Sequence, residues 1–130
     1  MLSVFSRIIK GELPAFKVCE DKDHLAFLDI APLSYGHVLV IPKQEEDYIF
    51  DISSDKYLEL FKFARRVAKG MRKAVPCQRI GIAVVGLEVP HAHIHLIPLN
   101  NVSDINFDRP KLSFSDQEFH QISCKIKDSI

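Results

Sequence analysis

Apolar residues along the chain follow a helical period in some stretches and a strand-like pattern in others. A short helix is predicted over residues 4–10, with Phe5, Ile8 and Ile9 at helical spacing. A long helix is predicted after Ser53 and Ser54, where apolar residues recur every third or fourth position up to Pro76. Both segments place one apolar face against a core.

The C-terminal part of the chain predicts a further helix. Ser115 and Glu118 have the spacing of a capping box, and Phe114 and Phe119 have that of a hydrophobic staple. Short apolar runs between the helices predict strands at residues 18–20, 24–29, 37–41, 79–85 and 91–97. This order predicts a single α+β domain over residues 1–130, because the strand-rich core has one long helix inserted.

Composition limits the binding partners and the cellular location that we expect. Lys plus Arg and Asp plus Glu both number 17, so the chain has no basic excess for gripping a nucleic acid, and we expect no nucleic-acid partner. The three cysteines are odd in number and far apart, which favours reduced thiols in a cytoplasmic protein. No run approaches the ~20 apolar residues of a membrane span, so we expect no membrane association.

The segment His91-Ala92-His93-Ile94-His95 contains half of the six histidines. On a strand, this alternation places the three imidazoles on one face and Ala92 and Ile94 on the other. Adjacent imidazoles repel each other when protonated, which keeps some of them neutral near pH 7. They could bind a metal, act as a nucleophile in phosphoryl or nucleotidyl transfer, or serve structure alone. The spacing alone does not distinguish a metal-binding role of these histidines from a nucleophilic one.

The segment His91-Ala92-His93-Ile94-His95-Leu96-Ile97 resembles the signature of the histidine triad (HIT) family, in which histidines alternate with apolar residues. Three further blocks are similar to that family in order and spacing, at residues 5–14, 26–32 and 36–43. The resemblance covers about residues 4–98 and leaves the tail 99–130 uncovered.

The resemblance implies an antiparallel sheet with one long helix and a C-terminal helix, and a homodimer that joins two half-sheets into one. It implies a hydrolase or nucleotidyl transferase that acts at the α-phosphorus of purine nucleoside phosphoramidates or related AMP derivatives, through a covalent nucleotidyl group on His93. His91 and His95 would orient His93 and contact the phosphate, and His37 would line the same pocket. A purine nucleotide or nucleotide conjugate is the expected partner, with no cofactor.

The resemblance also assigns the nucleoside contacts. Asp29 would hydrogen-bond the ribose hydroxyls. The base pocket would be formed by Phe5, Ile8, Phe27, Leu28 and Ile30. From the residues alone, a carboxylate at a strand end such as Asp29 is more often a turn former, and the apolar residues are by default part of the core.

The sequence departs from the family pattern at several positions. In many family members the first block contains two cysteines that contribute to a zinc site. Ser3 and Ser6 stand near those positions here, so we expect no metal. Leu87 stands where a glutamine is usual, Glu88 where Ser or Thr often contacts phosphate, and Leu99 where an arginine often follows. Because Leu87 and Glu88 remove expected phosphate contacts, a nucleotide-binding regulatory module with little or no catalysis is one alternative. A dinucleoside polyphosphate hydrolase and a metal-dependent enzyme are two further alternatives.

Overall fold

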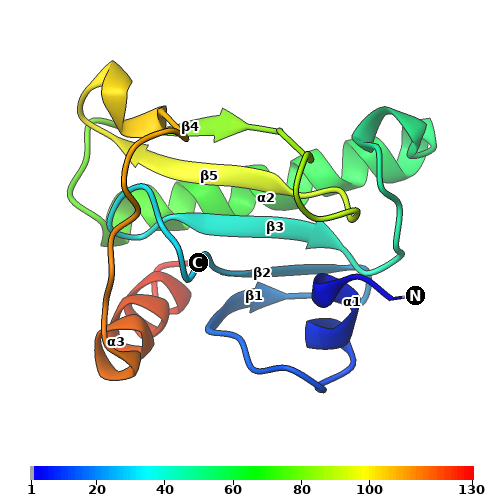
Figure 1. Cartoon of the computed structure of the whole chain (residues 1–130), viewed down its shortest axis with the longest axis horizontal. Helices are drawn as coiled ribbons and strands as arrows, with labels where there is room; N and C mark the ends of the chain where they lie inside the picture. Colours follow the sequence, from blue (N-terminus) through cyan, green and yellow to red (C-terminus); the bar gives the residue numbers. More distant parts are fainter. Residues whose placement is uncertain (1) are drawn as a thin grey trace.

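The computed structural model describes residues 2–130, which form a five-stranded sheet with helices on both faces (Figure 1). The elements in chain order are α1 (Val4–Ile9), β1 (Lys17–Glu20), β2 (His24–Leu28), β3 (Val38–Pro42), η1 (Ile49–Asp51), α2 (Ser54–Ala74), β4 (Arg79–Ala83), β5 (Ile94–Leu99), η2 (Val102–Ile105) and α3 (Asp116–Lys127). The strand order is β1-β2-β3-β5-β4, and every neighbouring pair is antiparallel. The predicted α+β class is confirmed.

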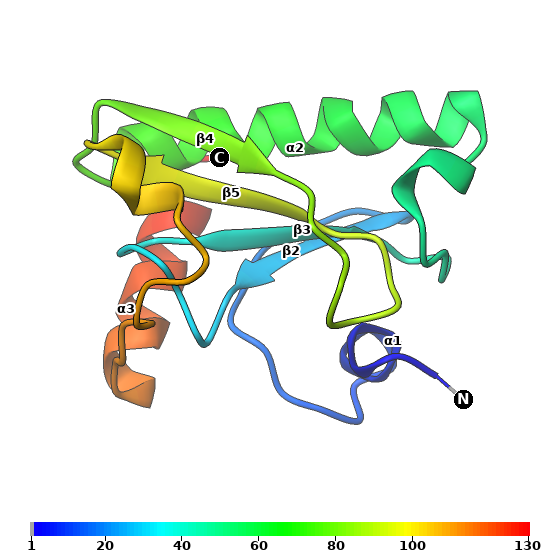
Figure 2. The ribbon, with the colours of Figure 1, turned by 45° about the horizontal axis from the view of Figure 1, so that its top comes forward.

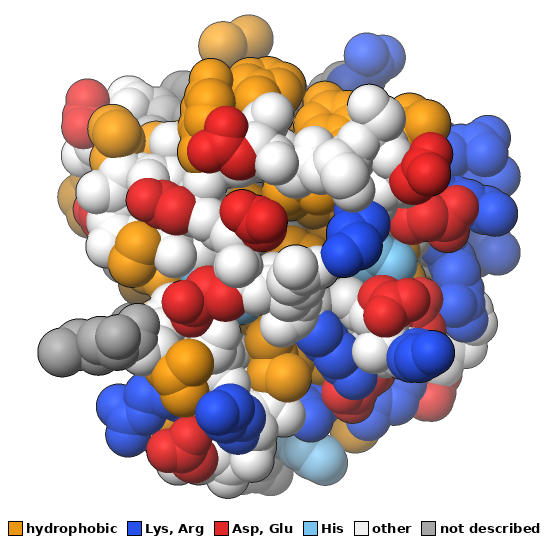
Figure 3. Space-filling model, turned by 90° about the vertical axis from the view of Figure 1, so that its right-hand side faces the viewer, with side chains coloured by type: hydrophobic (Ala, Val, Ile, Leu, Met, Phe, Trp, Pro, Cys, Tyr) orange, Lys and Arg blue, Asp and Glu red, His pale blue; other side chains and the backbone are white. Residues whose placement is uncertain are grey.

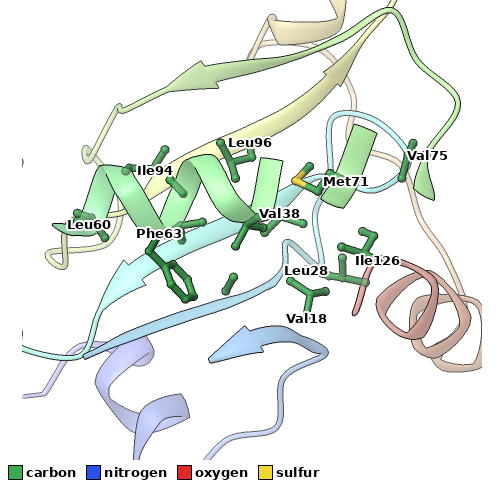
Figure 4. Packing of buried hydrophobic residues seen from close by; sticks show 14 of the residues in the cluster. Val18, Leu28, Val38, Leu60, Phe63, Met71, Val75, Ile94, Leu96 and Ile126 are labelled. Carbon is green, nitrogen blue, oxygen red and sulfur yellow. The ribbon is translucent and has the colours of Figure 1, made fainter. Parts of the chain in front are cut away.

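The helices cover the two faces of the sheet unequally. Helix α2 lies along one face and the short α1 covers part of the other (Figure 2), while α3 packs beside β1 and against α2. The α2 side holds the main core, in which Leu60, Phe63 and Met71 of α2 meet Val38 and Leu96 of the sheet (Figure 4). The α1 side therefore has the less extensive cover, and it is the side on which His91 and His93 lie against Phe5 of α1.

Strand alternation explains the two cores. In β2, Ala26 and Leu28 join the α2 side, whereas Leu25 and Phe27 join the smaller cluster under α1. Ala92, Ile94 and Leu96 lie in the main core, as the alternation around the histidines predicts.

Helix boundaries agree with the capping signals. Helix α2 begins after its N-cap Ser53 and ends at Ala74, two residues before Pro76. In α3, the Glu118 N–H donates to Ser115 Oγ and the Ser115 N–H donates to Glu118 Oε1, which confirms the capping box.

The exposed side of α2 carries Lys62, Arg66, Lys69 and Lys73. Figure 3 shows Lys and Arg side chains gathered along one edge of the molecule.

The strands on either side of the loop before the triad are shorter at that loop than predicted. Strand β4 ends at Ala83 rather than at residue 85, and β5 begins at Ile94 rather than at residue 91. The His91 N–H donates to the Val89 carbonyl and the Ala92 N–H to the Glu46 carbonyl. Because these amides are committed to loop carbonyls, ladder pairing starts only at Ile94, which faces Val40.

Strand β5 continues through Pro98 to Leu99, although a proline was expected to end it. Pairing with β3 stops at Leu96, so the missing proline N–H removes no hydrogen bond from that ladder.

Among the described residues, no helix has the long apolar stretch that crossing a bilayer requires.

Candidate active site

Four histidines from three segments meet on the α1 side of the sheet. His37 immediately precedes β3, His91 and His93 lie in the loop that leads into β5, and His95 is within β5; all four are buried. The ring centroids of His93 and His95 are 5.0 Å apart and those of His37 and His95 are 5.2 Å apart. The structure therefore brings the three triad histidines and the fourth predicted histidine into one group.

The hydrogen bonds of His37 and His95 define which nitrogens carry protons. The Leu33 N–H donates to His37 Nδ1 over 3.0 Å, so a neutral His37 carries its proton on Nε2. That Nε2 lies 2.9 Å from His95 Nδ1 and donates to it. A neutral His95 then carries its proton on Nε2, which is thereby presented as a hydrogen-bond donor.

The tautomer of His93 follows from its backbone contact. His93 Nδ1 lies 2.7 Å from the carbonyl oxygen of His91, and this oxygen can only accept, so Nδ1 donates. In the neutral ring, Nε2 of His93 consequently has a free lone pair. An imidazole nitrogen with a fixed orientation and a free lone pair is the arrangement that a nucleophile requires.

Burial keeps the surrounding imidazoles neutral. It lowers the pKa of His37 to about 3, aided by the neighbouring His95, and that of His95 to about 4, aided by His93. The pKa of His91 is lowered as well, mainly by burial and against the effect of the Pro42 carbonyl and Glu45. These rings therefore act at neutral pH as hydrogen-bond donors and acceptors rather than as fixed cations.

Asp29 lies beside this group at the end of β2. Its Oδ2 is 3.6 Å from His37 Nε2, and its Oδ1 accepts a hydrogen bond from the Ala31 N–H. Burial raises the pKa of Asp29 and outweighs the opposing effect of that N–H. Asp29 thus combines the turn-forming contact expected from its residue type with a place at the edge of the histidine group.

The predicted base-pocket residues divide into three groups. Phe5, Ile8 and Phe27 pack together. The centroid of the Phe5 ring lies 5.0 Å from that of His93 and 5.5 Å from that of Phe27. Ile30 is 70% exposed beyond the strand end. The structure does not bring Leu28 to this cluster, because its side chain joins Val18 and Ile126 in the main core (Figure 4).

The tail adds two residues that the sequence did not identify. The Phe107 ring lies edge-on to His95, with centroids 4.8 Å apart. The charge of Lys111 lowers the pKa of Asp29 and His37, and its ammonium donates to the carbonyl of Arg109. Both residues lie outside the recognised motifs and outside any periodic segment, so no sequence signal pointed to them.

The loop before β5 carries the two departures from the family pattern. Leu87 is 88% exposed and Glu88 is also exposed, and the Glu88 charge contributes to raising the pKa of Asp29. The site therefore has a negative charge from Glu88 and a positive charge from Lys111 near one carboxylate.

Asp29, His37 and His95 each offer one potential metal-ligand atom, and these atoms lie within 4.8 Å of one another. Ligation through His37 Nε2 would move its proton to Nδ1, where it would face the Leu33 N–H as a second donor. These residues therefore do not fit a metal without rearrangement.

Comparison with known proteins establishes the family. The HIT domain model matches residues 10–102, and the chain belongs to the histidine triad (HIT) family. A HIT-like protein of Borreliella burgdorferi is 35% identical, covering 98% of this chain and 97% of its own length. Adenosine 5′-monophosphoramidases of Saccharomyces cerevisiae and Schizosaccharomyces pombe are 40% and 34% identical, over 73% and 98% of this chain and 61% and 100% of theirs.

Solved structures agree with this assignment. A HIT-like protein from Bartonella henselae superposes with a TM-score of 0.85 at 26% identity, covering 98% of this chain and 96% of its own. A zinc-bound histidine triad family protein from Mycobacterium smegmatis has a TM-score of 0.80 at 25% identity, covering 97% and 91%. Family membership supports nucleotide hydrolase chemistry in general terms.

Proposed function

We propose that the protein is a hydrolase or nucleotidyl transferase that acts at the α-phosphorus of purine nucleoside phosphoramidates or related AMP derivatives. The observation that carries the proposal is the contact between His93 Nδ1 and the His91 carbonyl, which leaves His93 Nε2 as a free nucleophile. The yeast relatives named adenosine 5′-monophosphoramidase support the substrate class.

The proposed reaction has two displacements. In the first, the lone pair of His93 Nε2 forms a bond to the α-phosphorus while the bond from phosphorus to the leaving nitrogen breaks, and the departing amine takes a proton from solvent. In the second, water attacks the phosphorus, the bond to Nε2 breaks, and AMP leaves with one proton released. The His91 carbonyl accepts the Nδ1–H throughout, which stabilises the positive charge on the nucleotidylated ring.

The neighbouring groups have roles that follow from their protons. His95, whose Nδ1 accepts from His37, directs its Nε2–H as a donor to a phosphate oxygen. His91 orients His93 through its carbonyl. In this proposal Asp29 would accept hydrogen bonds from the ribose hydroxyls, and Phe5, Ile8, Phe27 and the exposed Ile30 would form the base pocket.

Turnover of an adenosine phosphoramidate tests this proposal. Purified protein should release AMP and the free amine, and His93→Ala should abolish the release. Two other functions have distinct outcomes: AMP binding in calorimetry without any turnover indicates a regulatory module, and preferential cleavage of dinucleoside polyphosphates indicates a hydrolase of that class. Equal activity of the wild type and His93→Ala would contradict the covalent mechanism.

We also propose a homodimer formed through β4. This strand lies at one end of the sheet, with Ile82 55% exposed and Val84 and Val85 also exposed just beyond it. An isologous pairing of two β4 strands would join the sheets and bury these side chains. Light scattering that gives the mass of a monomer at micromolar concentration would refute it.

The cysteines support a cytoplasmic location, which we add to the proposal. Cys19, Cys77 and Cys124 are all free. Burial raises the pKa of the Cys19 and Cys77 thiols despite nearby arginines, so both stay protonated at neutral pH. Unpaired, protonated thiols suit a reducing compartment.

A further inference from the structure

A closed hydrogen-bond network joins the start of α1 to His91. Ser3 and Ser6 are both buried, and the Ser6 N–H donates to Ser3 Oγ over 3.0 Å as part of the helix cap. Glu45 Oε1 accepts from the Ser3 N–H and from the Ser6 hydroxyl, each over 2.7 Å. Ser3 Oγ lies 2.8 Å from Nδ1 of the fully buried His91.

The proton positions in this network follow from the acceptors. The carbonyl of Pro42 lies 2.8 Å from His91 Nε2 and can only accept, so the neutral ring has its proton on Nε2. His91 Nδ1 is then an acceptor. The single Ser6 hydroxyl proton goes to Glu45, so the donor to His91 Nδ1 is the Ser3 hydroxyl.

We propose that Ser3, Ser6 and Glu45 form a positioning network that fixes the ring of His91 and, through the His91 carbonyl, the nucleophile His93. This inference rests on the proposed function for its catalytic consequence. The same residues place Phe5, which lies between the N-cap Ser3 and Ser6 in the first turn of α1, against the His93 ring. One set of contacts therefore holds both the nucleophile and the aromatic side chain that covers it.

The network also keeps a charge away from the nucleophile. The titratable groups that face His91 are Glu45, whose Oε1 is 3.9 Å from His91 Nδ1, and His93. Without the Ser3 hydroxyl, the nearest hydroxyl to His91 Nδ1 is that of Ser6, 3.4 Å away, and its proton goes to Glu45. The nearby carboxylate then favours protonation of His91 Nδ1. The resulting imidazolium beside His93 would raise the pH at which activity is lost on the acidic side.

The test compares Ser3→Ala, Ser3→Thr, Glu45→Gln and the double variant Ser3→Ala with Glu45→Gln. The matched control is Ser123→Ala, which removes a buried hydroxyl that bonds the His120 carbonyl within α3. Two readouts are used on the full chain: ¹⁵N chemical shifts of the His91 ring, and the pH profile of kcat and KM with an adenosine phosphoramidate.

In the wild type we expect an unprotonated His91 Nδ1 and a protonated Nε2. In Ser3→Ala, the pH below which both His91 nitrogens are protonated should be higher than in the wild type. The kcat should fall roughly tenfold, as expected for one lost hydrogen bond to a buried group. Ser3→Thr should restore both properties, and Glu45→Gln in the Ser3→Ala background should remove the protonation change.

Unchanged His91 shifts in Ser3→Ala and Glu45→Gln, with kinetics like those of Ser123→Ala, would overturn the proposal. If the wild type fails to cleave any phosphoramidate, the proposed function is wrong. The nitrogen shifts then still decide the network, because they do not depend on turnover.

Discussion

His37 Nε2 lies 2.9 Å from His95 Nδ1, so the backbone N–H of Leu33, which fixes the proton of His37, also determines the proton of His95. His37→Ala removes the donor to His95 and the acceptor for Leu33. We expect kcat/KM to fall by about 10- to 100-fold, since an unpaired buried group costs about 1–3 kcal/mol. Steady-state kinetics on an adenosine phosphoramidate measure this.

His24→Ala provides the control for that variant. His24 is also buried, but it stacks on Phe63 on the α2 side of the sheet, away from the triad. It should lower the melting temperature while leaving kcat/KM close to that of the wild type. Equal kinetic losses in the two variants would show that His37 acts through stability alone.

The low pKa values of the buried histidines predict an acid-dependent loss of stability. The unfolded chain binds protons at these residues below the ordinary value of 6.5, whereas the folded chain does so only near pH 3 at His37 and near pH 4 at His95. The free energy of unfolding therefore falls as pH drops from 6.5 toward those values, by roughly 2 kcal/mol for each histidine at pH 5.

Urea unfolding between pH 8 and about pH 4 checks this dependence. Its slope should be shallower in His37→Ala, which has one such group fewer. The raised pKa of Asp29 acts in the opposite sense, because the folded chain takes up that proton first as pH falls. A slope that is the same in both proteins would show that His37 is not the group responsible.

Glu88→Ser should improve phosphate binding. The change removes a negative charge that acts on Asp29 and supplies the hydroxyl usual in the family. A new hydrogen bond to a charged group is worth at most about 1.5–3 kcal/mol, so we expect KM to fall by at most roughly 10- to 100-fold. Glu59→Gln, which removes an exposed carboxylate from α2, is the control. A tenfold loss of kcat/KM in Glu88→Ser would instead mean that Glu88 assists the reaction.

Phe5→Ala should weaken nucleotide binding and stability together. The Phe5 ring contacts both His93 and Phe27, so its removal opens a cavity beside the nucleophile and costs about 3 kcal/mol. Val4→Ala, which shortens the exposed preceding side chain, should change neither property. Calorimetry with AMP and thermal unfolding separate the two effects. Wild-type affinity for AMP in Phe5→Ala would exclude this ring from the base pocket.

The sequence predicted those parts of the site that follow from local periodicity. Alternation placed His91, His93 and His95 opposite Ala92 and Ile94, and this arrangement holds even though β5 begins only at Ile94. The same rule separates Phe27 from Leu28: adjacent residues of a strand face opposite sides, so the two side chains do not share one pocket.

The remaining parts of the site depend on long-range contacts. Phe107 reaches His95 and Lys111 lies near Asp29 and His37 because the tail crosses back, where the Leu112 N–H donates to the Pro32 carbonyl. The Ser3 contact with His91 spans 88 residues. No local pattern encodes such contacts, since they arise only when the sheet has brought distant segments together.

The central claim is that His93 forms a covalent bond to the α-phosphorus. Brief reaction with an adenosine phosphoramidate, an alkaline quench and mass spectrometry of peptides test it directly. We expect AMP on the peptide that contains His93 in the wild type and none in His93→Ala. Absence of the adduct from the wild type, together with full activity in His93→Ala, would contradict it.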